Sequence, residues 1–204
     1  MQDRTQAKQE DKAMGAAHVP RARIHASGTG VSPVKGVSSF TATRRNLPHW
    51  EDPGSVYFVT WSTAGKTRLV PEERTLTLAA IRYWDSVRWT VYCAVIMPDH
   101  VHVLVQPLRV PGKQPPEWYA LGSIIHSVKS YSAHQINRLR RQSGAVWQDE
   151  REDRIMRSEK EFREKWQYVR DNPVKENLTV TAEEYPWFYQ QGDVQPGKDS
   201  TVPA

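Results

Sequence analysis

Residues 90–106 read Thr90-Val-Tyr-Cys-Ala-Val-Ile-Met-Pro-Asp-His-Val-His-Val-Leu-Val-Gln106, and they predict a β-hairpin. The runs 90–97 and 100–106 are rich in residues that favour strands, and Pro98-Asp99 between them is typical of a turn. Successive side chains of a strand point to opposite faces, so His100 and His102 share one face. The other face is directed into the core and carries Val101, Val103 and Val105.

The pattern before this hairpin predicts one strand and one helix. Aromatic and β-branched residues between Pro53-Gly54 and Ala64-Gly65 favour a strand over 55–62. Apolar residues then recur at helical spacing over 72–84, which predicts a helix with an apolar side made of Leu76, Ala79, Ala80 and Tyr83.

The pattern after the hairpin predicts two helices and a short strand. The first helix is expected over 118–141, with an apolar face made of Leu121, Ile124, Ile125, Val128, Ile136 and Leu139. Residues 145–148 favour a strand. The second helix is expected to begin at Ser158, with Glu161 as its capping-box partner, and to end before Pro173.

This order of elements predicts the fold class. The split βαβ, or ferredoxin-like, plan has the order strand, helix, strand, strand, helix, strand, and here one more helix follows it. We therefore expect an α+β fold, in which an antiparallel sheet carries helices on one face and is joined by a C-terminal helix. The domain is expected over 46–190, with order beginning near Trp50, between a disordered basic tail at 1–45 and a flexible tail at 191–204.

Composition excludes several classes of protein. The chain has 204 residues, of which 38% are hydrophobic and 25% charged, as in a soluble single-domain protein with a sizeable core. The single cysteine, Cys93, excludes an intramolecular disulfide and a multi-cysteine zinc site. No apolar run is long enough to span a bilayer and the N-terminus lacks the apolar stretch of a signal peptide, so we expect a cytoplasmic protein without a membrane partner.

The net charge of +5 arises in the first 45 residues, which contain eight basic and three acidic residues. The remainder of the chain is balanced in charge. A basic arm of this kind either strengthens binding to nucleic acid or only keeps the chain soluble, and charge alone does not separate the two interpretations.

His100 and His102 form the sharpest local motif. Two imidazoles on one face of a strand can chelate a divalent metal. The alternative is a pair of surface histidines on a half-exposed strand, and a His-x-His motif alone favours neither interpretation.

Tyr168 and Asn172 form a second pair, because residues four apart lie on one face of a helix. A tyrosine hydroxyl can act as a covalent nucleophile, and an amide oxygen is a suitable ligand for Mg²⁺ or Mn²⁺. Each residue alone also fits a structural role, as a core tyrosine and a helix stop before Pro173. Taken together, the two pairs predict a metal that polarises a phosphate oxygen and a tyrosine that displaces a 3′-hydroxyl, leaving a 5′-phosphotyrosine.

The motifs extend well beyond these four residues. They comprise Tyr57-Phe58-Val59-Thr60, residues 97–102, residues 127–131, Val146-Trp147-Gln148, residues 168–174 and Tyr185-Pro186-Trp187. In order and spacing, from about Asn46 to Trp187, the chain resembles the REP-associated tyrosine transposases, which belong to the single-tyrosine HUH transposases. The hydrophobic residue that this family has between its two histidines is Val101 here.

The resemblance implies an HUH endonuclease fold and a specific site. His100 and His102 would be metal ligands, Asn172 the third ligand and Tyr168 the nucleophile. The cofactor would be Mg²⁺ or Mn²⁺, the substrate single-stranded or hairpin DNA, and the chemistry cleavage and rejoining by transesterification. The chain would act as a monomer or a homodimer.

The long helix over 118–141 offers further candidates. Tyr131 is the alternative nucleophile, although the resemblance favours Tyr168. The helix contains no acidic residue, so a basic face could contact DNA phosphates or could simply be solvated; its members are Lys129, Arg138, Arg140 and Arg141.

Two other functions are compatible with parts of the sequence. One is a DNA-binding module that keeps the fold and binds hairpins without cutting them. The other is a metal-dependent hydrolase that activates water, which would need further strong ligands that the sequence does not cluster. Covalent attachment of the protein to DNA would separate the transferase from both alternatives.

Overall fold

A five-stranded antiparallel sheet lies at the centre of the computed structural model, which describes residues 41–44 and 48–192. Its strands are β3 (Tyr57–Ser62), β4 (Trp89–Ile96), β5 (His100–Pro107), β6 (Glu152–Ile155) and β7 (Phe188–Gln190). The helices are α2 (Pro71–Tyr83), α3 (Leu121–Arg140) and α4 (Glu159–Lys175), with short 3-10 turns at Ala64–Lys66 and Ala182–Glu184. No helix in these described ranges is long and apolar enough to cross a membrane.

The sheet has the strand order β6-β3-β5-β4-β7. Its first four strands follow the split βαβ plan, because β5 lies between β3 and β4 and pairs with both in antiparallel register. The predicted hairpin is the β4–β5 pair, which turns at Pro98-Asp99. The predicted α+β ferredoxin-like fold is thereby confirmed.

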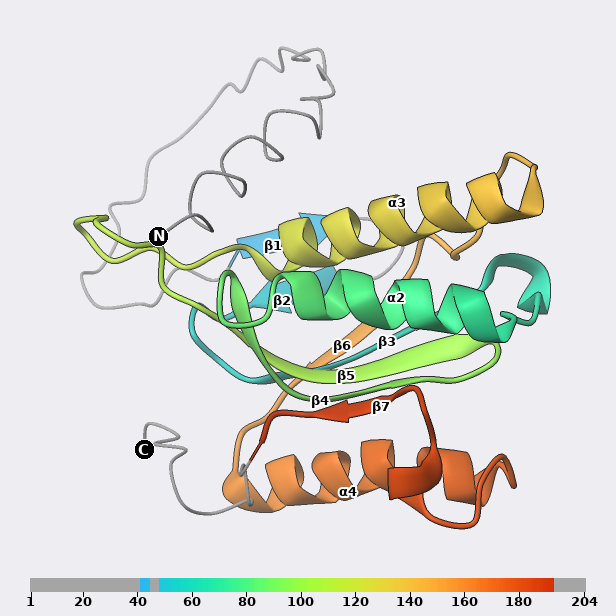
Figure 1. Cartoon of the computed structure of the whole chain (residues 1–204). Coiled ribbons are helices and arrows are strands. Elements are labelled where there is room, and N and C mark those ends of the chain that lie inside the picture. The colour runs from blue at the N-terminus through green and yellow to red at the C-terminus, as the bar shows by residue number, and fades with distance from the viewer. Residues whose placement is uncertain (1–40, 45–47, 193–204) are drawn as a thin grey trace, which may run out of the picture. The chain divides into compact units, whose positions relative to one another are not determined.

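Helices cover both faces of the sheet. Figure 1 shows α2 and α3 side by side on one face and α4 on the other. The core between the sheet and the α2–α3 layer includes Val59, Trp61, Ile81, Val103, Ile124 and Ile136. The core between the sheet and α4 is smaller and includes Cys93, Val95, Leu104, Phe162 and Val169.

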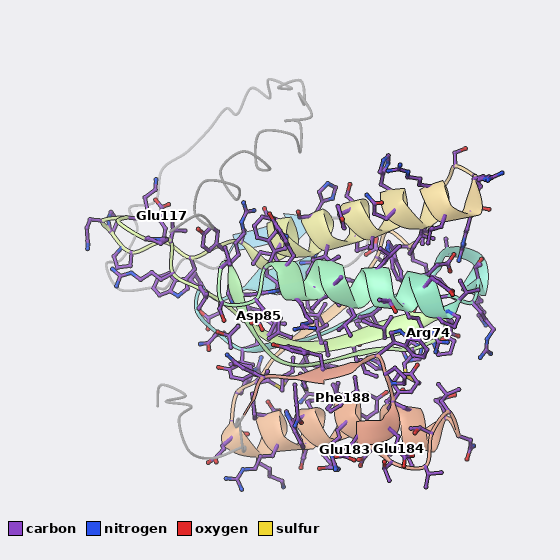
Figure 2. All side chains as sticks on the ribbon, viewed as in Figure 1. Arg74, Asp85, Glu117, Glu183, Glu184 and Phe188 are labelled. Atoms are coloured by element: carbon purple, nitrogen blue, oxygen red, sulfur yellow. The ribbon has the colours of Figure 1, made fainter. Side chains whose placement is uncertain are left out.

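The α4 layer is completed by the segment after the helix. Phe188 of β7 packs against the α4-side core, and Figure 2 shows it between the sheet and the helix. Glu183, in the 3-10 turn beside α4, accepts hydrogen bonds from Arg170 of the helix. Tyr185 is buried, and its hydroxyl donates to the carbonyl of Ile96 in β4 at 2.9 Å. These contacts fix α4 against its face of the sheet.

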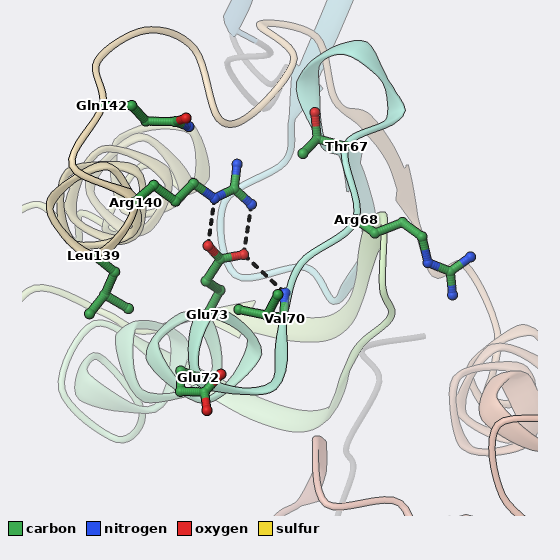
Figure 3. A pocket seen from close by; sticks show the side chains of 8 residues that line it. All are labelled: Thr67, Arg68, Val70, Glu72, Glu73, Leu139, Arg140 and Gln142. Carbon is green, nitrogen blue, oxygen red and sulfur yellow. Dashed lines mark hydrogen bonds and ion pairs between the residues drawn. The ribbon is translucent and has the colours of Figure 1, made fainter.

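A buried ion pair joins α2 to α3. The Glu73 carboxylate accepts hydrogen bonds from two nitrogens of Arg140 and from the Val70 backbone N–H (Figure 3). A fork-like guanidinium matches a carboxylate in this way. Burial raises the pKa of Glu73, but the hydrogen bonds from Arg140 and Val70 outweigh it and hold the pKa below its usual value.

The predicted apolar side of α2 is only partly correct. Its buried residues are Glu73, Thr77, Ala80 and Ile81, whereas Tyr83 is 46% exposed. The face is rotated because Glu73 is drawn inward by Arg140 and Thr77 donates its hydroxyl to the Glu73 carbonyl. On α3 the predicted face is buried except for Leu139, which is 56% exposed.

The short strand predicted at 145–148 is wrong. Only a single bridge, between Trp147 and Thr63, forms there, and the fourth strand of the plan is β6. Its sequence Glu-Asp-Arg-Ile lacks an apolar alternation, as suits a charged edge strand. The three-residue strand β7, which pairs with β4, has no period long enough to recognise and was not expected.

The predicted Ser158 cap of α4 is confirmed, although the Glu161 carboxylate accepts the backbone N–H of Arg157 instead of that of Ser158, and the predicted end of the helix is wrong. Ser158 is the N-cap, and its hydroxyl accepts the Glu161 N–H at 3.2 Å. The helix continues through Pro173 to Lys175, so the predicted stop before the proline is wrong. Pro173 lies in the last turn, where the lost backbone hydrogen bond disturbs few others, and Asn172 therefore keeps a helical position.

Structure also begins earlier than Trp50. Strands β1 (Thr41–Arg44) and β2 (Pro48–Glu51) pair in a separate two-stranded antiparallel sheet. Strands of four residues are too short to show a period, so this hairpin was not expected. Residues 1–40, 45–47 and 193–204 lie outside the described residues, and the predictions of a basic N-terminal tail and a flexible C-terminal tail therefore stay predictions.

Candidate functional site

Strand β5 directs its two histidines toward α4. Val101, Val103 and Val105 belong to the core under α2 and α3, whereas Leu104 belongs to the core under α4. His102 alternates with these valines and is 5% exposed, on the same face as Leu104. The predicted division of the strand into a histidine face and a valine face is confirmed.

A neighbouring side chain holds Nδ1 of each histidine. Asp99 Oδ1 lies 2.7 Å from His100 Nδ1, and Thr60 Oγ1, across the β3–β5 pair, lies 2.7 Å from His102 Nδ1. The two rings have centroids 4.7 Å apart. Because a carboxylate accepts the Nδ1–H of His100, and the Thr60 hydroxyl can accept that of His102, the Nε2 lone pairs are left to bind a ligand.

His102 is a neutral imidazole at physiological pH. Burial lowers the pKa of His102 to about 3, with smaller contributions from His100 and from the positive charge of Lys165. A neutral ring is the form that binds metals. Phe58 stacks on this ring with centroids 5.4 Å apart, which fixes its plane.

Tyr168 lies on the α4 face that is directed toward these histidines. Its ring centroid is 5.2 Å from that of His102 and 5.8 Å from that of Phe58, in edge-on geometry. The side chain is 37% exposed, so it is not a core residue. The structure thus brings together a tyrosine of α4 and the histidines of β5, two pairs that lie far apart in the sequence.

Two buried polar atoms at this site lack a hydrogen-bond partner within the described part of the chain. They are His102 Nε2 and Asn172 Oδ1. Asn172 is 6% exposed and lies one helical turn after Tyr168 on the same side of α4. Most buried polar groups in native proteins are paired, so two such atoms beside one tyrosine are compatible with a ligand at this place.

The donor set fits a divalent metal. Imidazole nitrogens and an amide oxygen suit Mn²⁺, and Mg²⁺ accepts the amide oxygen while keeping other positions for water or phosphate oxygens. Among the described residues no group of three or more His, Cys, Asp or Glu side chains offers a metal site. The assignment of His100, His102 and Asn172 as ligands stays a prediction.

Tyr131, the alternative nucleophile, lies elsewhere. It is 40% exposed on α3, and α3 covers the face of the sheet opposite to α4 (Figure 1). The histidines are directed to the α4 face, so the sheet separates Tyr131 from them. The structure brings Tyr168, and not Tyr131, to the histidine pair.

The four basic candidates on α3 do not form one surface. Arg140 is engaged by Glu73, and Lys129 donates to the backbone carbonyls of Gln148 and Asp149. These two side chains have intramolecular partners that their spacing in the sequence does not reveal, and their contact with DNA stays a prediction. Arg138 and Arg141 are exposed at the C-terminal end of α3 and stay candidates for DNA contact.

Sequence reasoning assigned no individual role to five residues that surround the site. Thr60 and Asp99 hold the histidines, Phe58 stacks on His102, and Lys165 and Lys175 lie over the ring of Tyr168. The lysines could have been recognised, because they lie three residues before and seven after Tyr168 and so share its helix face. The others depend on strand register and turn geometry.

Comparisons with known proteins add information on the fold. No family model and no curated protein matches the chain. Among solved structures, a REP-associated tyrosine transposase bound to a REP hairpin matches with a TM-score of 0.57 and 18% identity, covering 71% of this chain and 82% of the other. The resemblance to REP-associated tyrosine transposases is therefore confirmed at the level of the fold.

Two weaker structural matches complete the comparison. A chain described as a candidate transposase of Deinococcus radiodurans R1 matches at 18% identity and a TM-score of 0.41, over 62% of this chain and 94% of the other. A bacterial tRNA(His) guanylyltransferase-like protein in complex with ATP matches at 11% identity and a TM-score of 0.39, over 66% and 68%. These similarities are too low to carry an argument about function.

Proposed function

We propose that this protein is a metal-dependent transposase that cuts and rejoins single-stranded or hairpin DNA, with Tyr168 as the nucleophile. His100, His102 and Asn172 would hold Mg²⁺ or Mn²⁺. The product of the first step would be a 5′-phosphotyrosine, which conserves the energy of the phosphodiester bond and allows a second DNA end to be joined without a nucleotide cofactor.

One observation carries the proposal. The half-exposed Tyr168 ring lies 5.2 Å from the ring of His102 and one helical turn before Asn172, and among the described residues the buried atoms His102 Nε2 and Asn172 Oδ1 have no hydrogen-bond partner. A partly exposed tyrosine next to a donor set for a divalent metal is the arrangement that transesterification of a phosphodiester requires.

Each residue of the site has a separate task in this chemistry. When bound, the metal would act as a Lewis acid toward a non-bridging phosphate oxygen. Asp99 and Thr60 engage Nδ1 of the imidazoles, which leaves Nε2 as the nitrogen for a metal. Phe58 restricts the ring of His102, and α4 keeps Tyr168 and Asn172 one turn apart.

The bonds balance without a further reactant. Tyr168 Oη forms a bond to phosphorus, and the bond from phosphorus to the 3′-oxygen breaks. The phenol loses its proton and the departing 3′-oxygen gains one. The reverse reaction, with a different 3′-hydroxyl as the attacking group, rejoins the strand and frees Tyr168.

The DNA substrate is proposed from the neighbouring structure and the sequence. The structure with the same fold is a transposase bound to a REP hairpin, which supports hairpin DNA as the substrate class. A module that binds hairpins without cutting has the same fold and is the second candidate. The unpartnered donor atoms of His102 and Asn172 favour the enzyme, because a binding module has no use for them.

The test is cleavage of hairpin repeats taken from the flanks of the gene, each carrying single-stranded extensions. We expect wild-type protein to cut them with Mg²⁺ or Mn²⁺ and not with EDTA. His102→Ala and Asn172→Ala should lose at least tenfold in rate, whereas His126→Ala, an exposed histidine of α3, should not. Binding without cleavage in every metal condition would favour the non-cutting module.

A further inference from the structure

One face of α4 carries two lysines as well as the proposed nucleophile. Lys165, Tyr168, Asn172 and Lys175 are spaced three, four and three residues apart, which keeps them on one side of a helix. The nucleophile and the proposed amide ligand therefore have a cation before them and a cation after them.

Both ammonium groups converge on Tyr168. Lys165 Nζ lies 5.2 Å from the centroid of the Tyr168 ring, and Lys175 Nζ lies 5.4 Å from it. Lys165 Nζ also lies 4.8 Å from the centroid of Phe58, whose ring stacks on that of His102. Lys165 is thus close to the nucleophile and to a proposed metal ligand at once.

The other basic side chains of α4 are used differently. Lys160 pairs with Glu164, Arg163 with Glu159 and Arg170 with Glu183. Over residues 52–192, by contrast, no carboxylate lies within ion-pair distance of Lys165 or Lys175. The two lysines beside Tyr168 are therefore set apart from the charge pairs that cover the rest of the helix.

Electrostatics explains what this arrangement favours. Two cations directed at one ring repel each other, and Lys165 would also repel a divalent metal at the histidines. An anion bound between the two lysines attracts both ammonium groups and the metal, and so offsets these repulsions. A DNA phosphate next to Tyr168 Oη is the anion that the proposed reaction brings to this place.

We propose that Lys165 and Lys175 form a phosphate-binding site that holds the DNA backbone on either side of Tyr168. The proposal rests on the proposed function, because it places substrate phosphates at the same tyrosine. Lys165, which also lies over the Phe58 ring that stacks on His102, would contact the phosphate under attack. Lys175, at the last turn of α4, would contact a neighbouring phosphate.

A structural role is the competing explanation. Cations over aromatic faces stabilise proteins, and Lys175 also complements the C-terminal end of the α4 dipole. Under that explanation, loss of either lysine would lower the melting temperature and leave the affinity for DNA unchanged. The two explanations therefore differ in a measurable quantity.

The test measures binding of fluorescein-labelled oligothymidylate by anisotropy, in EDTA and over a range of KCl concentrations. Lys165→Gln and Lys175→Gln should each weaken binding by about fivefold at low salt and should reduce the salt slope, d log K/d log [KCl], by about 0.7. Lys165→Arg should restore both quantities. Lys160→Gln, on an exposed and paired lysine of the same helix, is the matched control and should change neither.

Unaltered affinity and slope in both glutamine variants, with melting temperatures lowered, would overturn the phosphate site. The assay uses neither metal nor cleavage, so its result is independent of the chemistry. Loss of slope in a protein that never cuts DNA would uphold the phosphate site and contradict the transferase. Cleavage of DNA by wild type, together with unchanged salt slopes in both glutamine variants, would uphold the transferase and contradict the phosphate site.

Discussion

At the scale of single residues, the neutral state of His102 determines what the site can bind. Its ring is enclosed by Phe58, Thr60 and Tyr168, and burial is the main reason for its lowered pKa. Protonation would place a charge in this enclosure beside His100 and Lys165. The site therefore accepts a proton poorly and keeps a lone pair available for a metal.

This environment predicts an acid-dependent loss of stability in metal-free protein. The pKa of His102 is about 3 in the folded state and about 6.5 in the unfolded chain. The unfolded chain therefore binds the proton first, and folding loses stability as the pH falls below 6.5, by about 2 kcal/mol between pH 7 and pH 5.

Urea unfolding of wild type and His102→Gln in EDTA at both pH values measures this effect. The variant should lose less free energy of unfolding than wild type over the same interval. His126→Gln, an exposed histidine, is the matched control and should behave as wild type. An equal loss of stability in His102→Gln and wild type would contradict the assigned environment of His102.

At the scale of elements, α4 packs on the sheet with one face and places Tyr168 near the histidines with the neighbouring face. One face packs on the sheet through Phe162 and Val169, and the neighbouring face presents Tyr168. The helix is fixed at its start by the Ser158 cap and at its side by Arg170–Glu183. The position of Tyr168 relative to the histidines therefore depends on how α4 docks, and not on a loop.

The α2–α3 layer depends on the Glu73–Arg140 pair. Glu73→Gln should lower the free energy of unfolding by about 1–3 kcal/mol, because it leaves the guanidinium of Arg140 half-buried without its charged partner. Glu72→Gln removes a neighbouring, exposed carboxylate of the same helical turn and should cost about 0.5 kcal/mol or less.

Chemical denaturation of both variants at pH 7 tests the pair. The pKa of Glu73 is lowered, so its contribution is fully present at pH 7 and is lost as the pH falls through that lowered value. Similar stabilities for the two variants at pH 7 would show that the ion pair contributes nothing beyond an exposed charge.

Periodicity and turn chemistry were sufficient to predict the elements that carry the site. The β4–β5 hairpin, the face of His100 and His102, and the Ser158 cap follow from local rules of strand alternation and capping. What failed depends on distant partners. Glu73 is buried because of Arg140, 67 residues away, and Lys129 is held by a loop 19 and 20 residues away.

In the candidate site, too, local patterns could be recognised in the sequence, whereas contacts between distant segments could not. The four residues of the proposed site could be named as candidates from the sequence, since His-x-His and Tyr-x-x-x-Asn are local patterns. Their assembly could not, because it requires the register of β3 on β5 and the docking of α4 on the second face of the sheet. The end of α4 was misjudged because Pro173 falls in a last turn that tolerates it.

At the scale of the whole molecule, one chain contains every residue of the proposed site. Tyr168 lies against His102 of its own chain, with ring centroids 5.2 Å apart. The arrangement in the structure is therefore a site completed within one protomer, and a partner chain is not needed to supply the tyrosine.

This arrangement predicts the outcome of mixing two inactive variants. Tyr168→Phe lacks the nucleophile and His102→Ala lacks a ligand, so a mixture should form no covalent DNA adduct if each site is completed in cis. Denaturing electrophoresis with labelled hairpin DNA and Mn²⁺ measures the adduct. Restored adduct formation in the mixture would mean that partner chains exchange α4 between their sites.

The most direct test of the central claim is to identify the tyrosine that becomes attached to DNA. Protein trapped with hairpin DNA and Mn²⁺ would be digested with nuclease and trypsin and analysed by mass spectrometry. Trypsin separates the two candidates, because Tyr168 lies in the peptide Trp166-Gln-Tyr-Val-Arg170 and Tyr131 in the peptide from Ser130 to Arg138. We expect a nucleotide on the Tyr168 peptide and its loss in Tyr168→Phe. A nucleotide on the Tyr131 peptide, or no modified peptide from protein that binds the same DNA, would contradict the account.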